Sequence, residues 1–220
     1  MRPPPDRREG VNGTLALLAL LWCIWCALHS LLASPRVKAR LGRLLGRREG
    51  LYRLCYNLFA LATLIPLGLW SLSLQGRNLL SWSWPFTIVQ AILWGAAAVL
   101  FWGGARAYPV REFLGLGNQR SLGAGARASE NRLEKAGVLR MVRHPWYLAG
   151  LILLWARDLD PAALVTSVVF SLYLVIGAHL EEKRLVDEFG EEYRIYQREV
   201  PMFIPFRGGL RFRRGGRRDS

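Results

Sequence analysis

Five consecutive residues, Arg143-His144-Pro145-Trp146-Tyr147, combine side chains that could bind a charged ligand. Proline is favoured in the first turn of a helix, so Pro145 predicts that a helix begins here. The free N–H groups of a helix N-terminus attract anions, and Arg143 adds a guanidinium that matches a carboxylate or phosphate. Trp146 and Tyr147 offer ring faces that can hold a cation. A ligand that carries both a carboxylate and a cationic centre would suit this mixture.

Both this segment and a second cluster, Glu181-Glu182, also have simpler explanations. Arginine and aromatic residues occur at the ends of membrane helices for anchoring alone, and local chemistry by itself favours that explanation for residues 143–147. The two glutamates could accept hydrogen bonds from hydroxyls or amines of a bound cofactor. They could equally be solvated helix positions paired with Lys183 and Arg184. The local chemistry leaves these alternatives open.

Long apolar stretches predict the elements that must position these residues, namely an all-α, polytopic membrane helical bundle. A helix needs about 20 apolar residues to cross a bilayer. Four stretches approach or exceed that length, and they cover residues 14–33, 54–74, 86–105 and 161–179. A fifth, 145–155, is shorter, and only a tight polar turn separates it from the fourth long stretch. We therefore expect about five transmembrane helices, the last two forming a hairpin.

The hairpin's first arm and the residues that follow its second arm need separate treatment. We expect the first arm to begin near Val138 and to cross at a tilt, with a re-entrant arm as the alternative. After residue 180 the apolar positions recur at helical spacing, which predicts a cytoplasmic amphipathic helix that ends before Pro201. The apolar positions of this helix are Leu185, Phe189, Tyr193 and Tyr196.

The basic residues predict how the bundle is oriented. The net charge is +14, and residues 34–53, 106–145 and 180–220 hold 7, 8 and 10 of the 30 Lys and Arg residues. With five crossings these segments share one side of the membrane, which the positive-inside rule makes cytoplasmic. We expect an integral protein of the bacterial inner membrane, with its N-terminus outside and its C-terminus in the cytoplasm.

Three consequences follow from this topology. Loop arginines that anchor helices argue against a nucleic-acid partner and for contact with membrane lipid. His29, His144 and His179 all fall at the cytoplasmic end. The single C-x-x-C pair, Cys23 and Cys26, lies inside an apolar run and predicts no metal site.

Two sequence blocks resemble a known family. Arg143-His144-Pro145-Trp146-Tyr147-Leu148-Ala149-Gly150 resembles the R-H-P-x-Y signature of isoprenylcysteine carboxyl methyltransferases and related membrane methyltransferases. Glu181-Glu182-x-x-Leu185-x-x-x-Phe189-Gly190-x-x-Tyr193-x-x-Tyr196-x-x-x-Val200-Pro201-x-x-x-Pro205 is similar to that family's C-terminal pattern. Gly150 stands one residue later than in the strict form, and Leu139 replaces a frequent aromatic residue. The departures leave the substrate subgroup open.

The resemblance implies an S-adenosylmethionine-dependent methyltransferase whose cofactor lies between the two blocks on the cytosolic side. The acceptor would be a thiol or carboxylate of a small or lipophilic molecule. Arg143 and Glu181 would be catalytic, and His29 and Trp146 would contact the acceptor. The cofactor contacts implied by position are His144, Pro145, Tyr147, Glu182, Tyr193 and Tyr196.

The front half of the chain is similar to bacterial membrane thiol S-methyltransferases and to NnrU-like proteins of nitrite and nitric-oxide operons. The motifs that carry this are His29-Ser30-Leu31-Leu32-Ala33, Tyr52-Arg53 and Tyr56-Asn57. The alternative function is a non-catalytic protein that supports a respiratory or denitrification complex and binds haem through its histidines. In outline, residues 1–13 are expected to be irregular, 14–133 to hold the first helices, 134–206 to bind the cofactor and 207–220 to form a basic tail. The oligomeric state is left open.

Overall fold

A computed structural model describes residues 7–34, 37, 40, 49–74, 76–107 and 133–204. These parts of the chain are helical apart from turns and one isolated bridge between Leu80 and Leu159. In chain order the helices are α1 (Arg7–Ala33), α3 (Glu49–Ser73), α4 (Phe86–Ala107), the short 3-10 helix η2 (Gly137–Arg140), α7 (Pro145–Trp155), α8 (Pro161–Phe189) and α9 (Glu191–Glu199). The predicted all-α class is confirmed.

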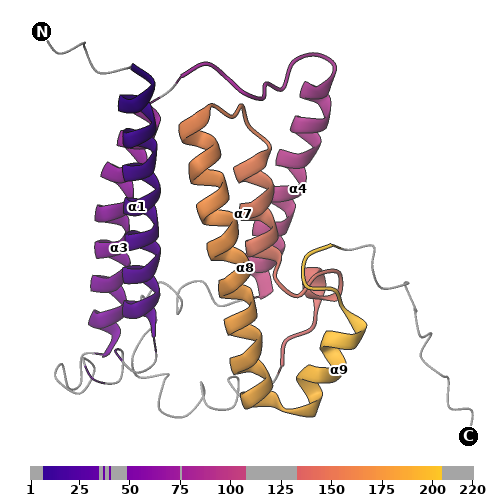
Figure 1. The fold of residues 1–220 in the computed structure, drawn as a ribbon. Coiled ribbons are helices and arrows are strands. Elements are labelled where there is room, and N and C mark those ends of the chain that lie inside the picture. Colours follow the sequence, from indigo (N-terminus) through magenta and orange to yellow (C-terminus); the bar gives the residue numbers. More distant parts are fainter. Residues whose placement is uncertain are drawn as a thin grey trace, which may run out of the picture.

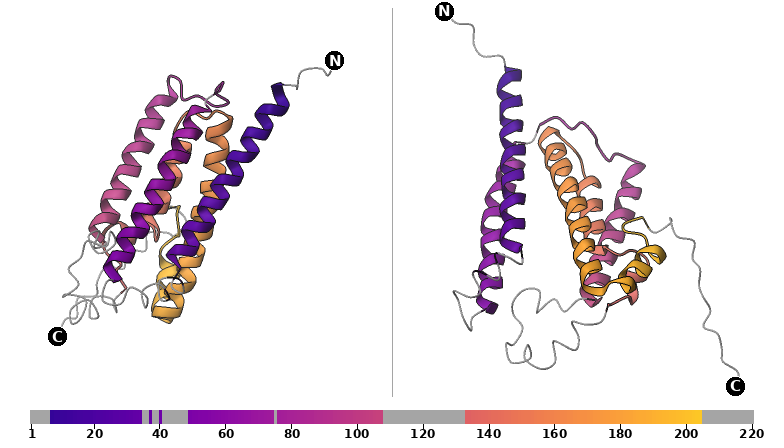
Figure 2. Two further views of the ribbon diagram at one scale, coloured as in Figure 1. Left: turned by 90° about the vertical axis from the view of Figure 1, so that its left-hand side faces the viewer. Right: turned by 60° about the horizontal axis from the view of Figure 1, so that its bottom comes forward.

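The helices form two groups joined by α8. Helices α1 and α3 lie side by side as one pair, and α7 packs between α4 and α8 in the second group (Figures 1 and 2). Helix α8 packs against α1, α3, α7 and α9, so it connects the two groups. The core between α1 and α8 contains Leu18, Trp22 and Ala162.

Polar side chains within this core are paired across helices. The indole of Trp22 donates to Thr166 Oγ1 at 3.1 Å, and the hydroxyl of Thr166 lies 3.1 Å from that of Ser71. The indole of Trp25 donates to Thr63 Oγ1 at 3.0 Å. Because an unpaired polar group is costly in hydrocarbon, these bonds fix the contacts of α1 with α3 and α8.

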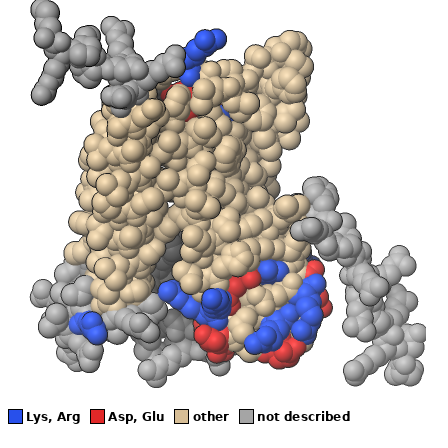
Figure 3. All heavy atoms as spheres, viewed as in Figure 1, with Lys and Arg blue, Asp and Glu red and all other residues tan. Residues whose placement is uncertain are grey.

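Four helices are long and apolar enough to cross a membrane, and their apolar segments are 10–33, 54–73, 86–107 and 161–189. Their flanks carry many exposed large apolar side chains, such as Leu69, Ile92, Trp102 and Leu172. In Figure 3 the coloured charged atoms gather mainly at the lower end, over α9 and the end of α8, and the flanks are tan. The chain is therefore an integral membrane protein.

Helix α7 forms the predicted hairpin with α8, but it is shorter than the expected spanning arm. Its 11 residues rise about 16 Å, roughly half of the hydrocarbon thickness. The helix does not extend back to Val138, which belongs to η2, because the turn after η2 interrupts it before Pro145. At the depth below α7 the chain is folded back as η2 and residues 200–203, beside α9 (Figure 1).

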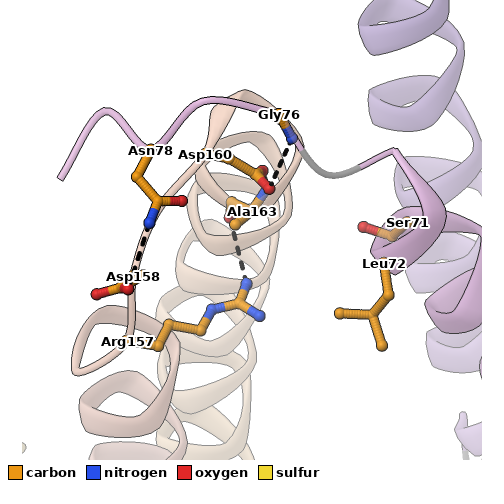
Figure 4. Close-up of a pocket in the computed structure, with 8 residues that line it drawn as sticks. All are labelled: Ser71, Leu72, Gly76, Asn78, Arg157, Asp158, Asp160 and Ala163. Carbon is orange, nitrogen blue, oxygen red and sulfur yellow. Dashed lines mark hydrogen bonds between the residues drawn. The ribbon is translucent and has the colours of Figure 1, made fainter. Parts of the chain in front are cut away.

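The closed end of the hairpin is held by its aspartates and lies at the opposite end of the bundle from α9. Asp160 caps α8 by accepting a bond from Ala163 N at 2.8 Å, and it also accepts from Gly76 N at 3.3 Å. Asp158 accepts from the Asn78 amide at 3.3 Å, and Arg157 donates to Ala163 O (Figure 4). These groups line a pocket of about 370 Å³.

Two predicted boundaries are wrong. Residues 7–13 are helical rather than irregular, because extending an existing helix costs far less than nucleating one, and Thr14 Oγ1 bonds back to Gly10 O. The amphipathic helix after residue 180 is two helices. Helix α8 continues to Phe189, and Gly190 with φ +59° ends it and redirects the chain into α9. The predicted basic tail, 207–220, lies outside the described residues.

Candidate functional site at the N-terminus of α7

The N-terminus of α7 is joined to the C-terminal segment that follows α9. Pro145 occupies the first turn of α7 and is buried, and His144 is the residue before the helix. The backbone N–H of Arg143 donates to Pro201 O at 3.0 Å, and that of His144 donates to Met202 O at 3.3 Å. The two sequence blocks are therefore in direct backbone contact.

The guanidinium of Arg143 is engaged by the protein itself. Its Nε donates to Glu182 Oε1 at 2.6 Å, and Nη1 donates to the carbonyl oxygens of Gln197 and Val200. Only 8% of the Arg143 side chain is exposed. Because the planar guanidinium presents several donors in a fixed geometry, one residue ties α7, α8 and the end of α9 together.

Glu182 is the buried acceptor of this cluster. Besides the Arg143 bond, Oε1 lies 3.3 Å from His144 Nε2, and Oε2 accepts from the Gln197 amide at 2.9 Å. Three such contacts, one of them from a permanently charged guanidinium, hold the carboxylate in its ionised form. A carboxylate this occupied positions its neighbours.

His144 lies between the buried glutamate and a more accessible one. Its Nδ1 is 3.7 Å from Glu181 Oε2, while the Glu181 side chain is 44% exposed and the His144 side chain is 4% exposed. The ring of Tyr147 meets the His144 ring edge-on at 5.3 Å. Glu181 is thus the carboxylate of this cluster that a ligand can reach.

Tyr193 and Tyr196 support the site from beneath. Both are buried and pack with Val200, Leu133 and residues of α8. The Tyr196 hydroxyl donates to Leu139 O at 2.6 Å, which fixes η2 on α9. Burial, together with the nearby Glu182 carboxylate, raises the pKa of Tyr193 above its usual range, so this phenol is neutral.

The aromatic residues of the R-H-P block point toward different helices. Trp146 lies against α4, where its indole donates to Phe101 O at 3.1 Å and its ring fills the space over Gly104. Tyr147 lies against α8 beside Gly177, where an added Cβ would be 3.4 Å from the Tyr147 ring. The structure therefore brings Tyr147 to His144, while Trp146 is placed in the α4–α7 contact.

The three histidines occupy three separate settings. His29, on α1, lies among Trp25, Tyr56 and Tyr173 rather than beside His144. His179 is exposed and its Nδ1 is 2.7 Å from Val175 O. In the described parts of the chain no group of three or more His, Cys, Asp or Glu side chains is placed to hold a metal. The expectation that all three histidines share one end does not bring them together, and no geometry here favours the haem alternative.

Sequence reasoning missed Gln197, Gly177 and Gly104. Gln197 follows Tyr193 by one helical turn on the face that carries the buried tyrosines, so its side chain returns to Glu182. Its position on that face was the available signal. The two glycines admit Tyr147 and Trp146, and only the helix contacts reveal that role.

Comparison with known proteins gives the family and a set of named relatives. The chain is 48% identical over 69 residues to a methanethiol S-methyltransferase of a Pseudomonas species, which covers 31% of this chain and 26% of that protein. It is 36% identical over 97 residues to methanethiol S-methyltransferase 1 of Bradyrhizobium diazoefficiens, covering 44% of this chain and 34% of the relative. A methanethiol S-methyltransferase of Mycobacterium tuberculosis is 28% identical over 144 residues, 58% of each chain.

These matches have defined limits. The chain spans about a quarter to a third of the length of the first two relatives. No solved structure matches the chain. The NnrU protein family, in contrast, matches residues 17–206, which include α3, α4, α7, α8, α9 and most of α1. This chain belongs to the NnrU family.

Proposed function

We propose that this protein is an integral membrane methyltransferase that transfers a methyl group from S-adenosylmethionine to a small thiol. The observation that carries the proposal is the cluster at the start of α7, where the R-H-P block meets the Glu181-Glu182 block and leaves one carboxylate, Glu181, half exposed. The names of the relatives, methanethiol S-methyltransferases, support a thiol as the acceptor.

The residues of the cluster suit this donor. S-adenosylmethionine supplies a methyl group on a sulfonium, next to an ammonium, a carboxylate and ribose hydroxyls. Glu181 would accept hydrogen bonds from the ammonium or a hydroxyl, and the ring face of Tyr147 would lie toward the cation. His144, held between two carboxylates, would orient Glu181. Pro145 would pre-form the helix terminus.

Arg143 and Glu182 take a positioning role in this proposal. The guanidinium spans from Glu182 to two backbone carbonyls, so it would hold the C-terminal segment against the site rather than contact the acceptor. Tyr193 and Tyr196 would support the same segment from below. Alignment of donor and acceptor is the main requirement of a methyl displacement, and rigid support of this kind lowers the barrier by several kcal/mol.

Glu181→Gln tests the donor site. Loss of a charged hydrogen-bond acceptor costs about 1.5–3 kcal/mol, so we expect S-adenosylhomocysteine to bind about 10- to 100-fold more weakly. The measurement is titration calorimetry on protein purified in detergent. The matched control is Glu188→Gln, an exposed carboxylate on the same helix, which should bind like the unaltered protein. Equal affinity in both variants, or no binding to the unaltered protein, would overturn the proposal.

A further inference from the structure

A small pocket lies between α1 and α3, apart from the cluster at α7. It has a volume of about 40 Å³, and its walls are apolar or aromatic except for an imidazole, a phenol and a threonine hydroxyl. The lining residues are Trp25, Leu28, His29, Leu32, Tyr56, Phe59, Ala60 and Thr63. A cavity needs about 10–15 Å³ to hold one water, so this one has room for a molecule of only a few heavy atoms.

His29 is the basic group of the pocket. Its Nε2 lies 2.8 Å from the Tyr56 hydroxyl, its ring stacks on Trp25 with centroids 4.9 Å apart, and the Tyr173 ring lies 6.2 Å away. The groups facing it from α3 and α8 are phenols, Tyr56 and Tyr173, and His29 takes part in none of the ion pairs found in the described residues. Without a carboxylate partner in this apolar setting the imidazole is neutral and can accept a proton.

Helix α8 connects this pocket with the α7 cluster. Tyr173, Gly177 and Glu181 follow each other at intervals of four residues, and they contact His29, Tyr147 and His144 respectively. Eight residues of helix separate Tyr173 from Glu181 by about 12 Å. A donor made of an adenosine joined to an amino acid is long enough to reach from Glu181 toward the His29 end of this stripe.

We propose that the pocket between α1 and α3 is the acceptor site, that it takes a small uncharged thiol, and that His29 removes the thiol proton. This inference rests on the proposed methyl transfer. The S–H bond breaks and its proton goes to the His29 imidazole. The sulfur lone pair then forms the new S–CH3 bond, while the bond between the methyl carbon and the donor sulfonium breaks and leaves a neutral thioether. The proton leaves His29 for water by way of the Tyr56 hydroxyl.

The lining explains the choice of acceptor. Sulfur makes favourable contacts with aromatic rings, which Trp25, Tyr56 and Phe59 supply. An amino acid thiol such as cysteine would have to bury an ammonium and a carboxylate with no charged partner in the pocket, which costs several kcal/mol. The volume excludes long prenyl chains from the pocket itself. A thiol of one or two carbons remains.

The first test replaces the base. His29→Gln keeps a polar side chain of similar size, and loss of a general base typically slows a reaction about 10²- to 10⁴-fold. We expect kcat/KM for methanethiol to fall by that factor while S-adenosylhomocysteine binding stays within twofold. Hydrogen sulfide ionises at a lower pH than an alkanethiol, so its methylation should fall much less. A merely structural role of His29 would lower both rates equally.

The second test fills the pocket. Ala60→Leu places three more carbons in the cavity, and Ala62→Leu places the same atoms on the exposed face of α3. We expect Ala60→Leu to raise KM for methanethiol at least tenfold and Ala62→Leu to leave it unchanged. If the unaltered protein methylates methanethiol and both His29→Gln and Ala60→Leu match their controls, this inference alone is overturned. If the unaltered protein neither binds the donor product nor methylates a thiol, the proposed function fails and the inference with it.

Discussion

At the scale of single residues, Arg143 shows how a motif residue can serve the structure rather than the ligand. Its side chain is nearly buried and pairs with the equally buried Glu182. Removing one partner of such a pair leaves an uncompensated charge, which costs about 3–5 kcal/mol, whereas the intact pair contributes little by itself. The motif arginine therefore decides whether the C-terminal segment stays docked beside α7.

Arg143→Ala should accordingly destabilise the protein by about 3–5 kcal/mol, measured as a large drop of the thermal unfolding midpoint in detergent. Arg143→Lys should fall between, since an ammonium cannot reach Glu182 and two carbonyl oxygens with fixed geometry. Arg184→Ala, an exposed arginine on α8, is the control and should change stability by less than about 0.5 kcal/mol. An unfolding midpoint for Arg143→Ala equal to this control would contradict the positioning role.

At the scale of elements, the contact between α4 and α7 depends on a glycine. Gly104 is buried, and a Cβ at this position would fall well inside contact distance of Trp146 Nε1. The Trp146 ring cannot simply move away, because its indole donates to Phe101 O. This contact sets how closely α7 approaches α4 and hence where the site at the start of α7 lies.

Gly104→Ala should therefore destabilise the α4–α7 contact by about 1–3 kcal/mol, the usual cost of overpacking a tight interface. Thermal unfolding in detergent measures it. Gly95→Ala on the same helix has nothing within 4 Å of the added methyl group, so it should be neutral or slightly stabilising. Equal behaviour of the two variants would show that α7 does not need this close approach.

At the scale of the whole molecule, the half-length α7 explains where a site can form in a membrane bundle. Polar backbone at membrane depth is tolerated where protein surrounds it, and here η2, α9 and residues 200–203 lie next to the start of α7. The opposite end of the bundle is closed by the hairpin turn and the Leu80–Leu159 bridge (Figure 4). The two ends therefore have distinct roles.

The proposed orientation places the α9 end in the cytoplasm. In a background where Cys23, Cys26 and Cys55 are replaced by alanine, Ser81→Cys and Glu199→Cys put single thiols at the two exposed ends. A membrane-impermeant maleimide should label Ser81→Cys in bacterial cells with a permeabilised outer membrane. It should label Glu199→Cys only after lysis. The reverse pattern would invert the topology that the basic loops predict.

The sequence by itself determined the helices and the two blocks of the site. Apolar runs of about 20 residues have few alternatives to crossing a bilayer, so the four long helices and the hairpin were predictable. Helical spacing also placed Tyr193 and Tyr196 on one face, because the period of a helix is local. Boundaries were less certain. Gly190 breaks a continuous apolar pattern, and the start of α1 lies in a polar segment that carries no apolar signal.

Only the tertiary structure decided which residues face each other. Periodicity gives the face of a helix but not the helix it meets, so the pairing of Arg143 with Glu182, the burial of Tyr193, and the contact of Trp146 with α4 could not be predicted. The same holds for His29. The sequence placed it near the end of a helix, and the packing of α1 on α3 and α8 gave it a pocket and two phenols. Contacts between distant segments depend on how whole surfaces fit, and no local pattern encodes that fit.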